Sequence, residues 1–256
     1  MENITRTFAQ GWRVETLRMT GFVAEVIKDP ERFQLWSAIT GESPENKIQN
    51  PRKAMLHEDG PFKNGKLILD IQPIRLDLLY TAQASDLAES KEMPTLGLFG
   101  EIIGDFEQLT NKLFSSEPFP PLQRIAFGSI LTNAVKDRKE GYKKLADFLR
   151  FPIDAENSCD FFYQINRPRV IDLPTEKIDI NRLSKWSVAG FEMLAVQIKP
   201  ELRPLSSSSP LYATRLEVDI STTQHFTGSF NNEALPALFS QLIDFGLEIS
   251  ERGDIP

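Results

Sequence analysis

Few side chains in this sequence have the types and spacing that catalysis or metal binding needs. The chain holds two histidines, His57 and His225, and one cysteine, Cys159. A zinc or iron site draws on several His, Cys or carboxylate ligands at short spacing. His57 is followed by Glu58 and Asp59 but has no second histidine nearby, and His225 stands alone before an expected helix. We therefore predict neither a metal nor a cofactor, and interpret both histidines as loop or turn residues.

The potential nucleophiles are equally isolated. Gly128-Ser129 lacks the second glycine of a Gly-x-Ser-x-Gly elbow. Cys159 has no histidine near it in the sequence, so we expect an inert thiol that is buried or half-buried. These features predict no catalytic residue and favour a protein that is not an enzyme. The alternative is a hydrolase or transferase that uses strand carboxylates, for which the candidates are Asp70, Asp77 and Glu217.

Four arginines are the candidate ligand-binding residues. Arg75, Arg124, Arg167 and Arg215 each lie in or at the end of an expected strand. Guanidinium groups on the polar face of an antiparallel sheet can converge on a carboxylate or a phosphate. The competing interpretation is that they form ion pairs across strands, and the acids available for this are Asp77, Glu217 and Asp219.

Composition narrows the classes of partner. The 256 residues include 29 basic and 36 acidic side chains, for a net charge of −7. Nucleic acids and anionic membranes are bound through clustered Lys and Arg, so we expect neither as a partner. One cysteine cannot form a disulfide framework, the N-terminus shows no apolar signal segment, and no run of about 18 apolar residues is present. These features predict a cytoplasmic protein.

Alternating apolar residues predict the strands. The expected strands cover Trp12 to Ile27, Lys66 to Tyr80, Leu122 to Val135, Phe161 to Ile165, Trp186 to Ile198 and Tyr212 to Ser221. Within Lys66 to Tyr80 the apolar residues change parity after Pro73, which predicts a bulge or an edge position at that proline.

Helical spacing and turn-forming residues predict the remaining elements. Helices are expected over Pro30 to Ile39, Leu96 to Phe114, Arg138 to Leu149 and Asn232 to Glu251, the last of them long and amphipathic. Two segments rich in Gly, Pro, Asn or Ser, Thr40 to Gly65 and Pro200 to Pro210, are expected to be loops.

The order of these elements predicts the fold class. The three late strands follow one another without helices between them, which favours an α+β protein with a mostly antiparallel sheet and helices packed on one face. A doubly wound parallel sheet is the alternative. We expect a single domain, and if it consists of two fused halves their boundary lies in Ser115 to Pro121, which is rich in proline.

Three segments carry a family resemblance. Leu69 to Leu78 resembles an Ile-Gln-x-x-Arg strand, and Arg124 to Asn133 resembles an Arg-Ile-Gly-x-Arg-Tyr-Ile-Asn strand. Leu216 to Ile220, with the helix after it, resembles a closing strand and helix in the same order. The chain thus resembles an uncharacterised, sporadically distributed bacterial family of similar length. The resemblance implies no known activity, and the patchy distribution of that family points to mobile or defence-linked gene clusters.

Two classes of function remain. The lack of a catalytic set, beside two long expected loops, favours a non-enzymatic protein-binding or assembly component that recognises another protein or forms a homodimer. The alternative is a small-molecule binder. It would use either an apolar cavity under a sheet rich in phenylalanine, of which the chain has 18, or the arginine-bearing sheet face.

Overall fold

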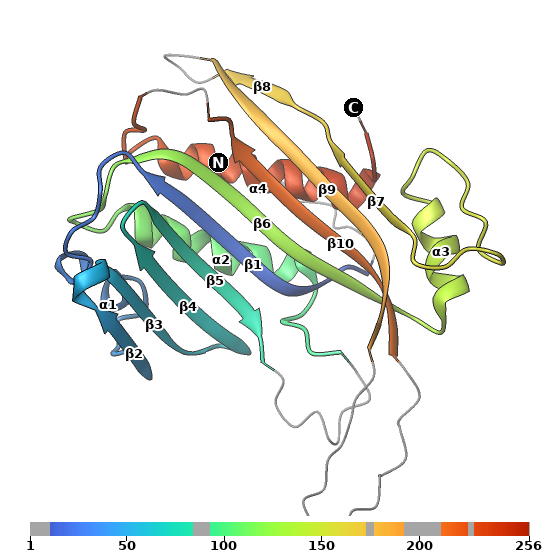
Figure 1. Cartoon of the computed structure of the whole chain (residues 1–256), viewed down its shortest axis with the longest axis horizontal. Coiled ribbons are helices and arrows are strands. Elements are labelled where there is room, and N and C mark those ends of the chain that lie inside the picture. The colour runs from blue at the N-terminus through green and yellow to red at the C-terminus, as the bar shows by residue number, and fades with distance from the viewer. Residues whose placement is uncertain (1–10, 84–92, 173–176, 192–210, 225–227, 256) are drawn as a thin grey trace, which may run out of the picture.

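The computed structural model describes residues 11–83, 93–172, 177–191, 211–224 and 228–255. Its strands form one sheet in which neighbouring strands run antiparallel, with helices packed beside it (Figure 1). The predicted α+β class with an antiparallel sheet is confirmed, and the parallel alternative is wrong. Within these ranges, no helix combines the length and apolarity that crossing a bilayer requires.

The sheet brings distant parts of the chain together. Its strands are β1 (Arg13–Val23), β2 (Asn46–Asn50), β3 (Met55–Phe62), β4 (Gly65–Gln72), β5 (Arg75–Ala82), β6 (Leu122–Val135), β7 (Phe162–Asn166), β8 (Arg169–Asp172), β9 (Lys177–Phe191) and β10 (Leu211–Thr222). Across the sheet they lie in the order β2-β3-β4-β5-β1-β6-β10-β9-β7, and β8 also pairs with β9. The long strands β1 and β6 are therefore neighbours in the middle of the sheet.

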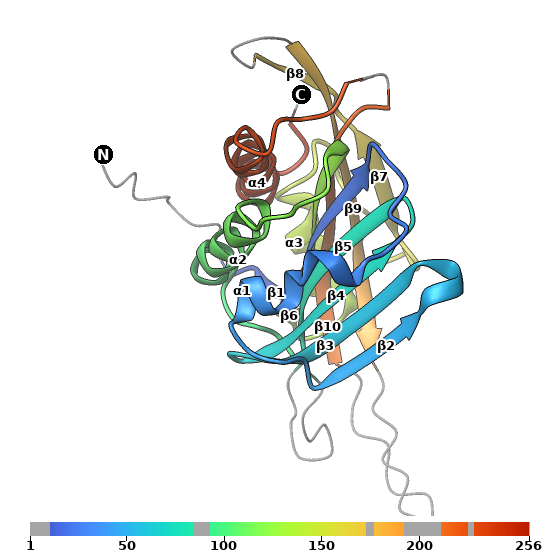
Figure 2. The same cartoon turned by 90° about the vertical axis from the view of Figure 1, so that its left-hand side faces the viewer.

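The long helices lie on one side of this sheet. The helices are α1 (Leu35–Thr40), α2 (Phe99–Phe114), α3 (Arg138–Ala146) and α4 (Leu235–Arg252), with short 3-10 helices at Glu31–Phe33 and Pro51–Lys53. α2 contacts β1 and α4 contacts β6 and β10, so both cover the same side of the central strands (Figure 2). In the part of the chain that the structure describes, no helix covers the opposite side of these strands, which we call the open face.

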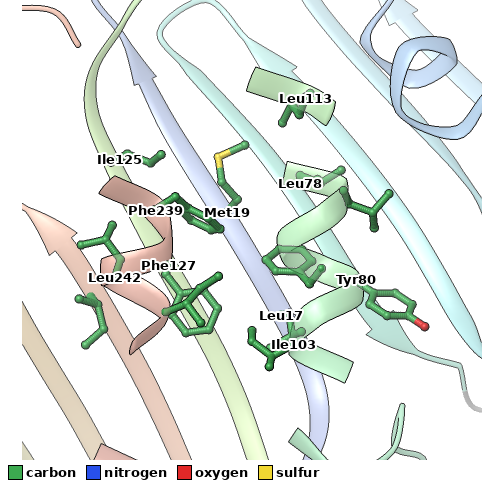
Figure 3. Packing of buried hydrophobic residues seen from close by; sticks show 14 of the residues in the cluster. Leu17, Met19, Leu78, Tyr80, Ile103, Leu113, Ile125, Phe127, Phe239 and Leu242 are labelled. Carbon is green, nitrogen blue, oxygen red and sulfur yellow. The ribbon is translucent and has the colours of Figure 1, made fainter. Parts of the chain in front are cut away.

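Alternation along each strand separates the core from the open face. Leu17 and Met19 of β1 and Phe127 of β6 point toward α2 and α4, where they meet Ile103 and Phe239 (Figure 3). All five side chains are buried. Because successive strand residues point to opposite sides, the residues between them, such as those on either side of Met19, face away from the helices.

The predicted loop from Thr40 to Gly65 is wrong, because this segment contains β2 and β3. All five residues of β2 are exposed, so this strand lacks the apolar alternation that identifies a half-buried strand. β3 includes Gly60 and Pro61, which usually interrupt strands. Both residues lie beyond the part of β3 that pairs with β2, where β3 pairs with β4 alone. Edge positions of this kind are where strands tolerate proline.

The parity change at Pro73 also has a different cause from the one predicted. β4 ends at Gln72 and β5 begins at Arg75, so Pro73 and Ile74 form a turn between two antiparallel strands rather than a bulge in one. In this hairpin Ile71 lies opposite Leu76, and both are buried on the helix side. The chain reversal therefore places the odd-numbered apolar residues of β4 and the even-numbered apolar residues of β5 on the same face of the sheet.

The late strands differ in their bounds from the prediction. β9 begins at Lys177, earlier than the expected Trp186, and β8 was not predicted. Pro200 to Pro210, and the expected strand beyond Phe191, lie outside the described residues.

The same order of elements occurs on each side of Ser115–Pro121. Before this segment the chain forms a long strand, a short helix, a group of strands and the long helix α2. After it, β6, the short helix α3, another group of strands and the long helix α4 follow in that order.

Candidate functional site: the open face of the sheet

The register of the central strands places charged side chains in rows across the open face. In one row Arg18 of β1 lies opposite Gly128 of β6, which lies opposite Asp219 of β10. Leu79 of β5 and Leu183 of β9 are the outer members of this row. The row therefore has a cation and an anion on either side of a residue without a side chain.

Gly128 allows Arg18 to reach across a strand. The Arg18 Nη2 lies 3.1 Å from Asp219 Oδ2, although β6 separates the two strands that carry them. A Cβ atom at position 128 would lie 3.2 Å from both Nε and Nη2 of Arg18, so the guanidinium lies directly over the glycine. Arg18 Nε is buried there and has no hydrogen-bond partner among the described residues. The ion pair thus depends on the lack of a side chain at position 128.

The next row also has one cation and one anion, here on the neighbouring strands β9 and β10. Thr16, Ile130, Glu217 and Lys185 lie opposite one another on β1, β6, β10 and β9. Lys185 Nζ is 3.6 Å from Glu217 Oε2. Each row therefore contributes one cation and one anion to the middle of the face.

These two rows enclose a hollow of about 330 Å³ on the open face. Its charged lining consists of Arg18, Lys185, Glu217 and Asp219, and its apolar lining includes Leu79, Ile130 and Leu183. We call this the Gly128 hollow. The side chains of Asp219 and Glu217 are 41% and 38% exposed, so both can contact a bound group.

Two of the four predicted arginines come together at another place on this face. Arg75 of β5 and Arg124 of β6 lie on either side of Phe22 of β1, as its register partners. Their guanidinium carbons are 5.8 and 4.7 Å from the centre of the Phe22 ring. Arg75 also binds Asp77, two residues further along the same strand, and Arg124 Nε donates to the carbonyl of Thr222.

The other two predicted arginines do not join them. Arg215 lies on the open face, where its Nε donates to Glu217 at 3.1 Å. Arg167 lies on the helix side, because it follows β7 and donates through both Nε and Nη2 to Asp254, just after α4. The four arginines therefore do not converge on one group. Asp77 and Glu217 pair with an arginine two residues away on their own strand, and Asp219 pairs across strands with Arg18.

The open face also contains three residues that were not among the predicted ligand-binding residues, namely Arg18, Lys185 and Gly128. Their proximity depends on the register of four strands, which a single sequence does not reveal. One available signal is that Ala126 and Gly128, which are small, alternate with the bulky Ile125 and Phe127 along β6. Such alternation predicts one face with little side-chain volume.

The strand carboxylates named as an alternative catalytic set are separate. Asp77 accepts hydrogen bonds from Thr20 and Arg75, and Asp70 binds His57. Glu217 lies in the Gly128 hollow, on the far side of β1 and β6 from the other two. Within the described ranges no cluster of three or more His, Cys, Asp or Glu residues is arranged to hold a metal ion.

His57 was expected to lie in a loop, but it is part of β3. Its Nδ1 is 2.7 Å from Asp70 and its Nε2 is 2.8 Å from Asp59. Partial burial lowers the pKa of His57, but the bonds to Asp70 and Asp59 outweigh this and raise it above its ordinary value. Burial acts to raise the pKa of Asp59, yet hydrogen bonds from Asn46, Lys66 and His57 lower it to about 2.

These two shifts predict how stability changes with pH. Folding raises the pKa of His57, so protonated His57 stabilises the folded protein. This stabilisation is complete below the unfolded pKa of about 6.5 and is lost as the pH rises through the folded pKa. Ionised Asp59 stabilises the folded protein above its unfolded pKa of about 3.9, and this stabilisation is lost as the pH falls toward its folded pKa. We expect the melting temperature to fall as the pH rises above neutrality, and the fall to be smaller in His57→Gln. An equal fall in both proteins would show that His57 does not cause it.

Two candidates from the sequence remain, Cys159 and His225. Cys159 is exposed, so the expectation of a buried or half-buried thiol is wrong. It lies between α3 and β7, in a segment that continues to a left-handed residue at Asp160. His225 lies outside the described residues.

Comparison of the chain with protein-family models, with curated proteins and with solved structures finds no match.

Proposed function

We propose that this protein is a non-enzymatic recognition component whose open face binds a segment of another protein. The observation that carries the proposal is the Gly128 hollow, which lies in the middle of the side of the sheet that α2 and α4 leave uncovered. A sheet face that is not part of the core but bears a hollow and oriented charges is suited to recognition. Among the described residues no group of three or more His, Cys, Asp or Glu side chains is placed to hold a metal ion.

The charges of the hollow indicate the chemistry of the bound segment. Arg18 and Lys185 are each paired with an acid, so an incoming anion meets cations that already have partners. A segment with both signs of charge can replace these ion pairs. Its acidic side chains would bind Arg18 or Lys185, and its basic side chains would bind Asp219 or Glu217. Leu79, Ile130 and Leu183 provide apolar contacts between these charges. The proposed partner therefore presents alternating acidic, basic and apolar side chains.

We infer that the wider setting is a multi-gene bacterial system, mobile or defence-linked, in the cytoplasm. The resemblance of three segments to a sporadically distributed bacterial family supports the setting, and a lone, exposed Cys159 suits a reducing compartment. We also infer one domain made of two fused halves, supported by the repeated order of elements around Ser115–Pro121. The Gly128 hollow lies across the junction of these halves, where β1 meets β6.

The test is capture of the products of neighbouring genes by the purified protein and by charge-reversed variants. Lys185→Glu places a third acid beside Glu217 and Asp219, and we expect it to reduce capture at least tenfold, as loss of about 1.4 kcal/mol would. Lys177→Glu is the matched control, because Lys177 is on the same strand and the same side of the sheet but pairs with Asp172, away from the hollow. Equal capture by both variants, with unchanged melting temperatures, would refute the proposal.

A small molecule is a second candidate occupant. The hollow of about 330 Å³ has room for a compound the size of an amino acid, and its lining offers both a cation and an anion. Native mass spectrometry of freshly purified protein should then show a bound compound that is lost in Gly128→Val, since the valine occupies the floor of the hollow. A protein that carries no compound, and that captures a protein partner, favours the first candidate.

A further inference from the structure

The outer edge of β2 has the properties of a pairing surface. β2 is the last strand in the order of the sheet, and among the described strands it pairs only with β3. Its five residues are all exposed, and Ile48 is 66% exposed, more than any other large hydrophobic side chain in the described ranges. An unpaired edge offers free N–H and C=O groups to another strand, and proteins usually protect such edges.

The usual protection of an edge by charge is weakened in β2. Lys47 is the one charged residue of this strand, and lysine commonly repels a second strand. Here its Nζ lies 2.6 Å from Glu31 and 3.6 Å from Glu58, its register partner on β3. The charge of Lys47 is thus neutralised within its own chain, on the side of the sheet opposite Ile48. No other charge in β2 opposes an approaching strand.

We propose that β2 pairs with β2 of a second copy of this chain, in an antiparallel arrangement with the twofold axis at Ile48. In this register Ile48 lies opposite Ile48 of the second copy and Lys47 lies opposite Gln49. Asn46 then lies opposite Asn50, so no like charges face each other. An interface in which the same surface pairs with itself closes after two copies. This inference depends on the edge of the sheet and not on the proposed function.

The opposite edge of the sheet is less suited to such pairing. It consists of β7 and β8, each of which has one exposed hydrophobic residue, Phe162 or Val170. Pro168 separates these two short strands and cannot donate a hydrogen bond. Pairing of this edge with β2 would also be heterologous and would extend into an open chain of copies. The twofold β2 pair is therefore the arrangement that the sheet favours.

The β2 pair would join two open faces. Ile48 is the register partner of His57, whose side chain binds Asp70 and so lies on the same side of the sheet as Asp77. Two sheets joined at Ile48 therefore form one continuous sheet with both open faces on the same side. A partner with repeated segments could occupy both Gly128 hollows, which raises its apparent affinity without new contacts.

The first test is the mass of the protein in solution. Sedimentation over a range of micromolar concentrations should show conversion from the 29.1 kDa chain to twice that mass. Ile48→Lys places like charges opposite each other at the axis, and we expect it to remain monomeric. Val170→Lys, at a residue that is 59% exposed on the other edge, should dimerise like the wild type. A wild-type monomer at every concentration, or an Ile48→Lys dimer, would overturn the inference.

The second test locates the contact independently of stability. In a Cys159→Ser background, Ile48→Cys places two thiols opposite each other at the axis, near enough to form a disulfide on oxidation. We expect a covalent dimer on a non-reducing gel, and none from Val170→Cys in the same background. Failure of Ile48→Cys to cross-link, in a protein that sediments as a dimer, would assign the dimer to another surface and overturn the β2 pair.

Discussion

Replacement of Glu248 by alanine is expected to lower the free energy of unfolding by about 3–5 kcal/mol. The side chain of Arg182 is fully buried between β9 and α4, and its Nη2 lies 2.9 Å from Glu248 Oε2. Its Nε and Nη1 are buried and have no hydrogen-bond partner among the described residues. Burial, and the nearby charge of Arg169, lower the pKa of Arg182. Without Glu248 the buried charge of Arg182 would lose its ion-pair partner. Urea denaturation would measure the resulting loss of free energy of unfolding.

Two variants separate this effect from a general sensitivity of the region. Arg182→Met removes the buried charge, and Glu248 keeps Arg169 at 2.7 Å and Arg252 at 3.7 Å as partners. We expect Arg182→Met to cost far less than Glu248→Ala, because an apolar residue of similar volume often replaces a buried ion without loss. Glu217→Ala, which removes the surface pairs of Glu217 with Lys185 and Arg215, should cost less than about 1 kcal/mol. Equal losses for Glu248→Ala and Arg182→Met would contradict this account.

Truncation of Phe239 should have an effect of similar size, about 3–5 kcal/mol for Phe239→Ala. This fully buried residue of α4 has its ring 5.7 Å from that of Phe114, 6.0 Å from that of Phe127 and 6.3 Å from that of Phe106. It therefore joins both long helices to the centre of the sheet. A cavity at this point removes contacts with α2 and β6 together, and thermal or urea denaturation would measure the loss.

Phe162→Ala is the matched control for this cavity. Phe162 is 61% exposed on β7, so its truncation should change the free energy of unfolding by less than about 0.5 kcal/mol. A small loss for Phe239→Ala would mean that the aromatic cluster does not hold the helices to the sheet. It would also weaken the premise that the helix side is the core and the opposite face is free to bind.

The sequence predicted the parts of the fold in which burial produces a pattern. The strand in which Tyr212 alternates with Arg215 and Glu217, and the helices around Phe106 and Phe239, follow directly from apolar spacing. β2 was missed because none of its residues is buried, and the turn at Pro73 was misread because a tight hairpin and a bulge both change the parity of the apolar residues. Periodicity reports which residues are buried, and it does not report chain reversal.

The candidate site was only partly predictable for a related reason. The arginine-bearing strands were identified, but Arg167 projects to the helix side while Arg75, Arg124 and Arg215 lie on the open face. Arg18 and Asp219 are two hundred and one residues apart in the sequence. Their contact needs the register of β1, β6 and β10 together with a glycine between them. A long-range arrangement of this kind leaves no local pattern.

We propose that the partner binds the open face and not the helix side. The most direct measurement is photo-crosslinking of the captured partner to a benzophenone side chain placed at Leu183 of β9 or at Lys112 of α2. Leu183 lines the Gly128 hollow, and Lys112 is exposed on the helix side. We predict a cross-link to the partner from position 183 and none from position 112. A cross-link from position 112 alone would contradict the account.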